Sequence, residues 1–125
     1  MLISQTGHVH LLTTRGNIAI LYISIANFMS IQTFGDSRTE KIFNGTRDKE
    51  VSKFPQDVLK VAERKLDMLD AAKQLKDLGS PPANMLERLK GQLKDYWSIR
   101  INDQWRVIFI WTDQGPLNVK IVDYH

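Results

Sequence analysis

The stretch that most constrains the fold is residues 96–112, which read YWSIRINDQWRVIFIWT. In its first half, Trp97, Ile99 and Ile101 alternate with polar residues, and the second half, from Trp105 onward, alternates less strictly. Period-two alternation of aromatic and β-branched residues is typical of half-buried strands. The polar break at residues 102–104 predicts a turn. We therefore expect a β-hairpin with one face on the core.

This hairpin sets two like charges opposite each other. A three-residue turn places Arg100 opposite Arg106, on the face away from the core, and such a pair is destabilising. One interpretation is that an anion lies over this face, because arginine forks match phosphate oxygens, and Lys90 can reach the same place. The other is that both arginines are solvated edge charges that splay apart. In both cases Arg106 is expected at the surface, so replacing it should leave the fold largely intact.

The segments before the hairpin predict a strand and helices. Residues 31–34 are expected to form a first strand, and Ser37 with Glu40 fits a capping box at a helix start. Pro55 suits the first position of a second helix. Lys65 lies off the apolar stripe of that helix and is expected on its solvated face. The stripe consists of Leu59, Ala62, Leu66, Leu69 and Ala72.

Three further strands complete the predicted architecture. A break in the second helix is expected between residues 72 and 76, before the prolines at 81 and 82 end it. Residues 85–90 and 117–122 are predicted strands on either side of the hairpin. The order of strand, helices and then strands predicts an α+β fold: an N-terminal strand and helices packed on a twisted, mainly antiparallel β-sheet.

Composition excludes several kinds of site. The chain has no cysteine, so it has no disulfide framework or Cys-based metal site, and its three histidines do not form a usual zinc pattern. We expect no metal and no cofactor. A net charge of +3 permits a nucleic-acid partner but does not demonstrate one.

Residues 1–28 differ from the rest of the chain, since they contain one basic residue and no acidic one. Their apolar run is too short to cross a bilayer. We treat residues 1–28 as an N-terminal extension and 29–125 as one domain. Three interpretations of the extension stay open: a misassigned start before Met29 or an unpacked segment, an additional strand or helix, and a signal peptide.

Four short motifs at fixed spacing resemble a known family. They are Leu89-Lys90-Gly91, the run SIRIN at 98–102, QWR at 104–106 and the ending VDYH at 122–125. Together they resemble HigB-type toxins of the RelE/ParE superfamily of bacterial toxin–antitoxin systems. The resemblance spans roughly residues 31–125 and implies the same compact fold.

The resemblance also implies a function and partners. Toxins of this type cleave mRNA in the ribosomal A site without a metal, and so inhibit translation in the cytoplasm. The implied partners are the ribosome, mRNA and a helix-turn-helix antitoxin of the HigA type, and only the complex with the antitoxin binds operator DNA. No membrane is involved. Two alternatives stay open: a ParE-type gyrase inhibitor, against which the Asp-Tyr-His ending argues, and a catalytically inactive antitoxin-binding module.

The candidate site residues follow from the chemistry of RNA cleavage, in which a 2′-hydroxyl attacks the adjacent phosphate. Arg106 and Lys90 fit charge stabilisation, His125 fits proton transfer, Tyr124 fits base stacking or hydrogen bonding, and Asp123 fits orientation of a cation. The resemblance implicates the same five positions.

The same residues also have structural interpretations: a turn lysine, a tyrosine covering the core edge, a surface ion pair and a frayed terminus. Arg100, Tyr96 and Lys94 are the additional residues that we expect to contact RNA. Some members of the family have a histidine three residues before the lysine of the Leu-Lys-Gly motif. Here that position is Glu87, which removes one candidate base.

Overall fold

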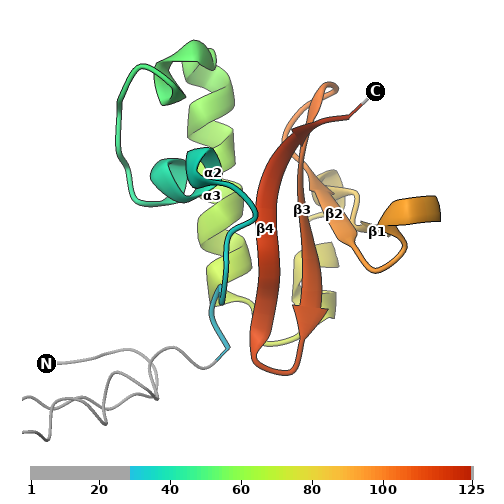
Figure 1. Ribbon diagram of the computed structural model, residues 1–125. Coiled ribbons are helices and arrows are strands. Elements are labelled where there is room, and N and C mark those ends of the chain that lie inside the picture. Colours follow the sequence, from blue (N-terminus) through green and yellow to red (C-terminus); the bar gives the residue numbers. More distant parts are fainter. Residues whose placement is uncertain (1–28, 125) are drawn as a thin grey trace, which may run out of the picture.

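The computed structural model describes residues 29–124, so the predicted extension and His125 lie outside the described residues. Within this range, two helices pack on one face of a four-stranded antiparallel sheet (Figure 1). The strands follow one another in the order β1-β2-β3-β4. The predicted α+β class is therefore confirmed. The elements are α2 (Ser37–Phe43), α3 (Gln56–Ala71), β1 (Glu87–Arg88), β2 (Trp97–Arg100), β3 (Trp105–Thr112) and β4 (Gly115–Asp123).

Short 3₁₀ turns connect these elements. The turn η1 (Val51–Lys53) precedes α3, and η4 (Gly91–Leu93) joins β1 to β2. Between α3 and β1 the chain passes through η2 (Leu75–Gly79) and η3 (Pro82–Asn84). The helix ends because Ala72 is extended, which confirms the predicted break.

The core lies between the helices and the sheet. Every residue of the predicted stripe on α3 is buried, and the sheet contributes Ile99, Val107 and Phe109 to the same cluster. Since these residues alternate along β2 and β3, the predicted period-two pattern correctly identified the covered face.

The helix starts differ from the prediction by one residue. Asp36, not Ser37, is the N-cap of α2, and its Oδ1 accepts a hydrogen bond from the backbone N–H of Thr39 at 2.8 Å. The predicted capping box is wrong because the carboxylate one residue earlier already fills the capping position. Likewise, Pro55 is the N-cap residue of α3 rather than its first helical residue.

The predicted first strand at residues 31–34 is reduced to one parallel bridge, from Phe34 to Val119 of β4. The helix α2 closes the next part of this edge: the backbone N–H of Ile121 donates to Thr39 Oγ1, and Arg38 donates to the Ile121 carbonyl. Covering an edge strand in this way prevents it from pairing with another chain.

Gly115 permits the start of the described chain to lie against β4. Its φ is +121°, and a Cβ placed on it would lie 2.2 Å from the carbonyl oxygen of Ser30. Any side chain there would be strained and would also collide with backbone. The docking of residues 29–35 therefore depends on this glycine.

Candidate active site

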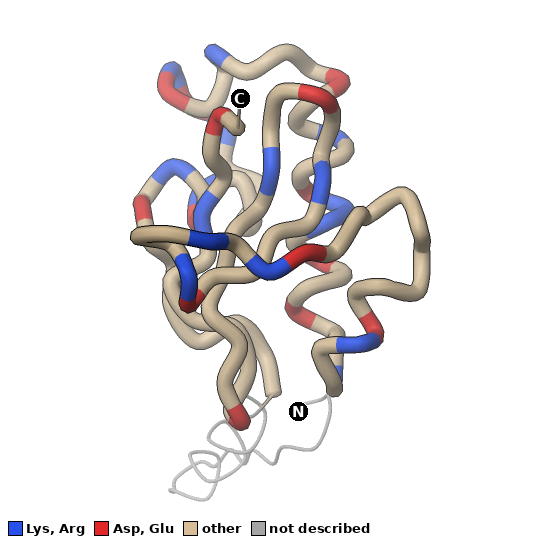
Figure 2. Tube along the Cα trace, turned by 90° about the vertical axis from the view of Figure 1, so that its right-hand side faces the viewer, with Lys and Arg blue, Asp and Glu red and all other residues tan. Residues whose placement is uncertain are grey.

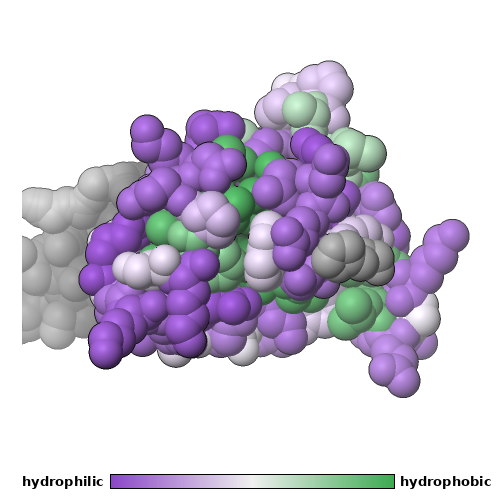
Figure 3. Space-filling view, turned by 90° about the horizontal axis from the view of Figure 1, so that it is seen from above, coloured by the Kyte–Doolittle hydropathy of each residue, from purple (hydrophilic) through white to green (hydrophobic). Residues whose placement is uncertain are grey.

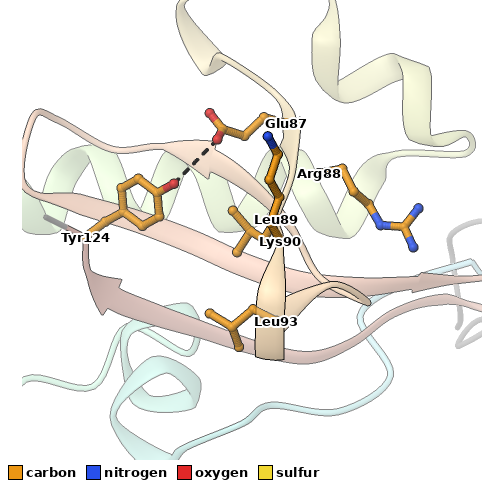
Figure 4. A pocket seen from close by; sticks show the side chains of 6 residues that line it. All are labelled: Glu87, Arg88, Leu89, Lys90, Leu93 and Tyr124. Atoms are coloured by element: carbon orange, nitrogen blue, oxygen red, sulfur yellow. Dashed lines mark hydrogen bonds between the residues drawn. The ribbon is translucent and has the colours of Figure 1, made fainter.

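A pocket of about 410 Å³ lies at β1 and η4, on the face of the sheet opposite the helices (Figure 4). Lys90 is an exposed residue at its mouth, in the turn between β1 and η4. The next residue, Gly91, has a φ of +65°, which explains the glycine in the Leu-Lys-Gly motif. The lining residues are Glu87, Arg88, Leu89, Lys90, Leu93 and Tyr124.

Arg106 does not line the pocket but lies beside two residues that do, Glu87 and Tyr124. It is only 6% exposed, so the expectation of a surface arginine is wrong. Its guanidinium donates to the backbone carbonyl of Met85 at 2.7 Å and lies 4.0 Å from a carboxylate oxygen of Glu87. The ring of Tyr124 covers it, with 5.1 Å between Arg106 Cζ and the ring centroid. The segment before β1 and the end of β4 thus bury a side chain that strand alternation places outside the core.

One donor of Arg106 is unused among residues 29–124. Its Nε is buried and has no hydrogen-bond partner in that range. Buried polar groups are nearly always paired, so an unpaired donor next to the residues that line a pocket needs an explanation. An anion bound in the site would supply the missing acceptor.

Glu87 is a site residue that sequence reasoning missed. Its carboxylate accepts a hydrogen bond from the Tyr124 hydroxyl at 3.4 Å (Figure 4) and is also close to Arg106. The family pattern identifies this position only as one that lacks a histidine. Its register carried a usable signal, because Glu87 lies opposite Ser98 and so shares a face with Arg106.

The end of β4 is tied to the start of β3. Asp123 lies opposite Trp105 in the sheet register, and its carboxylate accepts a hydrogen bond from the side-chain amide of Gln104 at 3.1 Å. The backbone N–H of Tyr124 donates to the Gln104 carbonyl at 2.6 Å. This pairing sets Tyr124 over Arg106. His125, which follows directly, lies outside the described residues.

The three residues predicted to contact RNA do not line the pocket. Arg100 lies opposite Arg106 as predicted, but its guanidinium pairs with Asp103 at 2.5 Å, so the two arginines point to different partners. Lys94 is exposed and Tyr96 is half-buried.

Of the predicted site residues, Lys90 and Tyr124 line the pocket and the Tyr124 ring covers Arg106. Asp123 lies opposite Trp105, so it is on the other face of the sheet from Arg106, and it contacts Gln104.

The charge balance of the pocket is positive. Basic positions recur on neighbouring segments of this face, with acidic ones between them (Figure 2). Arg88 points away from the pocket centre (Figure 4) and donates to the carbonyl of Lys94, with its guanidinium over the Trp97 ring. The lining thus carries two cations, Arg88 and Lys90, and one carboxylate, Glu87, which also lies 4.0 Å from the buried Arg106. No group of three metal-ligating side chains lies within residues 29–124.

A second pocket, of about 220 Å³, lies on the helix-covered side beside Trp105. Arg38 stacks there on Phe54 at 4.8 Å from the ring centroid, and Phe54 meets Trp105 edge to face. Seen from above, hydrophilic side chains surround an apolar strip (Figure 3). Arg38 and its aromatic neighbours close the end of the core at this pocket.

Comparisons with known proteins agree with this architecture. Residues 32–125 match the family described as the RelE-like toxin of the type II toxin–antitoxin system HigB. Toxin HigB-1 of Vibrio cholerae serotype O1 is 41% identical over 88 residues, which cover 70% of this chain and 90% of that protein. An uncharacterized protein of Haemophilus influenzae is 42% identical over 74 residues, covering 59% of this chain and 72% of that protein.

A solved structure, the YoeB–YefM complex from Staphylococcus aureus, shares the fold. The TM-score is 0.51 at 22% identity, and the match covers 78% of this chain and 97% of that one. In the part of the chain that the structure describes, no helix is long and apolar enough to cross a membrane.

Proposed function

We propose that this chain, which belongs to the HigB-like family of RelE-like toxins from type II toxin–antitoxin systems, is a ribosome-dependent, metal-independent endoribonuclease. It cleaves mRNA in the ribosomal A site and thereby inhibits translation. The observation that carries the proposal is Arg106: a buried guanidinium beside an open pocket, with an Nε that has no partner within residues 29–124. A phosphate in the pocket would complete its hydrogen bonding.

The reaction needs four functions from the protein. The RNA must be held, the 2′-hydroxyl must lose its proton, the pentacoordinate phosphate must be stabilised, and the leaving 5′-oxygen must gain a proton. The attack forms a bond from O2′ to phosphorus and breaks the bond to O5′, which leaves a 2′,3′-cyclic phosphate and a 5′-hydroxyl. Lys90 and Arg106 stabilise the phosphate charge, because both direct cationic donors at the site.

The remaining functions fall to groups around the two cations. Tyr124 offers an exposed ring on which a base can stack and a hydroxyl donor. His125 is assigned the proton transfer, because histidine is the side chain best suited to exchange a proton near neutral pH. Glu87 adds a carboxylate next to the Tyr124 hydroxyl and compensates for the histidine that this position lacks. Asp123 orients the end of β4 through Gln104.

The proposed partners follow from the same family. The toxin acts in the cytoplasm on mRNA held by the ribosome, and a helix-turn-helix antitoxin of the HigA type neutralises it. Operator DNA is bound only through the complex with that antitoxin. The YoeB–YefM complex, which shares the fold, is itself an assembly of two differently named proteins.

The direct test is toe-printing on programmed ribosomes with the purified chain, with EDTA-treated and untreated protein compared. We expect a new mRNA end within the A-site codon in both samples, and none on the same mRNA without ribosomes. Intact mRNA together with inhibited DNA supercoiling would instead indicate a gyrase inhibitor. Antitoxin binding with neither activity would indicate an inactive binding module.

A further inference from the structure

Lys65 contradicts the expectation from helical periodicity. It lies off the apolar stripe of α3, yet it is only 7% exposed. Its ammonium donates to the side-chain oxygen of Asn84, which is fully buried. Burying a lysine without a carboxylate partner costs free energy, so a chain that retains one here needs a reason.

Asn84 connects three parts of the structure. Its Oδ1 accepts from Lys65 of α3, and its Nδ2 donates to the carbonyl of Leu78 in η2 at 2.8 Å. The same Nδ2 lies 3.1 Å from the sulfur of Met68. These three polar contacts of one side chain fix η3, the turn that ends at Asn84, against α3 and η2.

The next residue, Met85, presents the carbonyl that holds Arg106. Met85 is in the left-handed region, with φ +47° and ψ +52°, which is unfavourable for a residue other than glycine. Its side chain is exposed, so burial of the side chain does not explain this backbone conformation. Its carbonyl accepts a hydrogen bond from the Arg106 guanidinium at 2.7 Å, whereas the Glu87 carboxylate lies 4.0 Å from it.

We propose that Lys65 and Asn84 are positioning residues for Arg106. Through the buried Lys65–Asn84 pair, α3 fixes the η3 turn, and the turn holds Met85 in its strained conformation. The Met85 carbonyl then holds the guanidinium beside Glu87 and under Tyr124, two residues that line the pocket. Where it concerns cleavage, this inference rests on the proposed function. It also explains why a polar pair, rather than apolar packing, occupies this part of the interior.

A first experiment tests the positioning without any activity. In ¹⁵N-labelled protein, the Nε–Hε signal of Arg106 is assigned by its loss in Arg106→Gln. Lys65→Met should move this signal and speed its hydrogen exchange. Lys60→Met, an exposed lysine of the same helix, should leave it unchanged. An unchanged Arg106 signal in a folded Lys65→Met protein would overturn the proposal.

A melting curve shows whether each variant folds. If Lys65→Met does not fold, the comparison is made with Lys65→Gln, whose shorter side chain retains a donor. A smaller movement of the Arg106 signal in the same direction is then expected, and no movement would again overturn the proposal.

A second experiment uses single-turnover cleavage on programmed ribosomes. Lys65→Met should slow cleavage about tenfold with ribosome binding nearly unchanged, because a small displacement of a catalytic group acts on the rate. In an Arg106→Gln background it should have no further effect. Equal losses in both backgrounds would show a merely structural role. Absence of cleavage by the wild-type protein would refute the proposed function, while the Arg106 signal would still decide the positioning.

Discussion

Two arginines on opposite faces of the sheet make nearly the same contacts. On the helix-covered face, Arg38 stacks on Phe54 at 4.8 Å and donates to the carbonyl of Ile121 at 3.2 Å. On the other face, Arg106 lies under the Tyr124 ring at 5.1 Å and donates to the carbonyl of Met85.

The difference between them lies in what surrounds these contacts. The aromatic partner of Arg38 is a buried core residue, so its stacking joins α2 to the end of the core. The partner of Arg106 is an exposed tyrosine near the chain end, a carboxylate lies within 4.0 Å, and one buried nitrogen is unpaired among residues 29–124. Similar contacts thus close the core on one face and leave a buried donor without a partner among residues 29–124 on the other. The predictions below separate stability on the helix-covered face from chemistry on the open face.

The largest effect should come from the end of β4. Deleting Tyr124 and His125 removes the ring over Arg106 and the histidine that follows it in the sequence. We expect cleavage to be abolished, with antitoxin binding and thermal stability near wild type. His125→Gln alone should slow cleavage less, because Lys90 and Arg106 still stabilise the phosphate. Rates on programmed ribosomes with a melting curve for each variant test this, and wild-type cleavage by the folded deletion would exclude the terminus from the mechanism.

On the helix-covered face the expected effect is on stability. Phe109 is fully buried, so Phe109→Ala should lower the free energy of unfolding by about 3–5 kcal/mol. The rate per folded molecule should stay the same at a temperature where the variant is folded. Urea unfolding and single-turnover cleavage measure the two quantities. A rate that falls while the protein remains folded would contradict the separation of the faces.

Replacing Lys90, an exposed residue, tests whether the open face of the sheet carries the chemistry. Lys90→Met should slow cleavage about 100-fold, because a charge-stabilising donor is lost. Since Lys90 is exposed, stability should change by about 0.5 kcal/mol or less. Lys94→Met is the matched control: Lys94 is also exposed but lies outside the pocket, so its loss should weaken RNA binding more than it slows the chemical step. Equal rates for both variants would remove Lys90 from the site.

The smallest expected effect is on how the free energy of unfolding depends on pH. Burial lowers the pKa of Lys65 below its ordinary value of 10.5, and the nearby charges of Arg64 and Arg100 act in the same direction. Between the folded and unfolded pKa values, the unfolded chain binds more protons, so this residue makes stability rise with pH in that alkaline window.

Lys65→Met should lack this contribution. Urea unfolding from about pH 7 to about pH 10 should therefore show wild-type stability rising relative to the variant. A difference in stability that stays constant with pH would mean that Lys65 titrates alike in the folded and unfolded chain.

Much of the fold could be predicted from the sequence. Alternation in β2 and β3 identified the covered face, because a sheet with one buried face shows period two directly. The stripe on α3 was equally clear. The N-cap of α2 was missed by one residue, since Asp36 and Ser37 are both good capping residues and sequence alone does not rank them.

The errors at the site share one cause. Hydrophobic periodicity shows which side of a single helix or strand faces the core. It does not show which other segment of the chain covers the opposite side. The turn η3 packs on α3 away from its apolar stripe and buries Lys65. Tyr124 lies over the open face of the sheet and buries Arg106. Glu87 was missed because its value depends on a tyrosine 37 residues later in the chain.

The most direct measurement compares Arg106→Gln with Arg38→Gln in the same two assays: single-turnover cleavage on programmed ribosomes and a melting curve. The account predicts that Arg106→Gln slows cleavage about 100-fold or more and that Arg38→Gln lowers the melting temperature while cleavage by the folded protein stays near wild type. Near wild-type cleavage by a folded Arg106→Gln protein, or a loss in Arg38→Gln as large as that expected for Arg106→Gln, would contradict the assignment of chemistry to the open face.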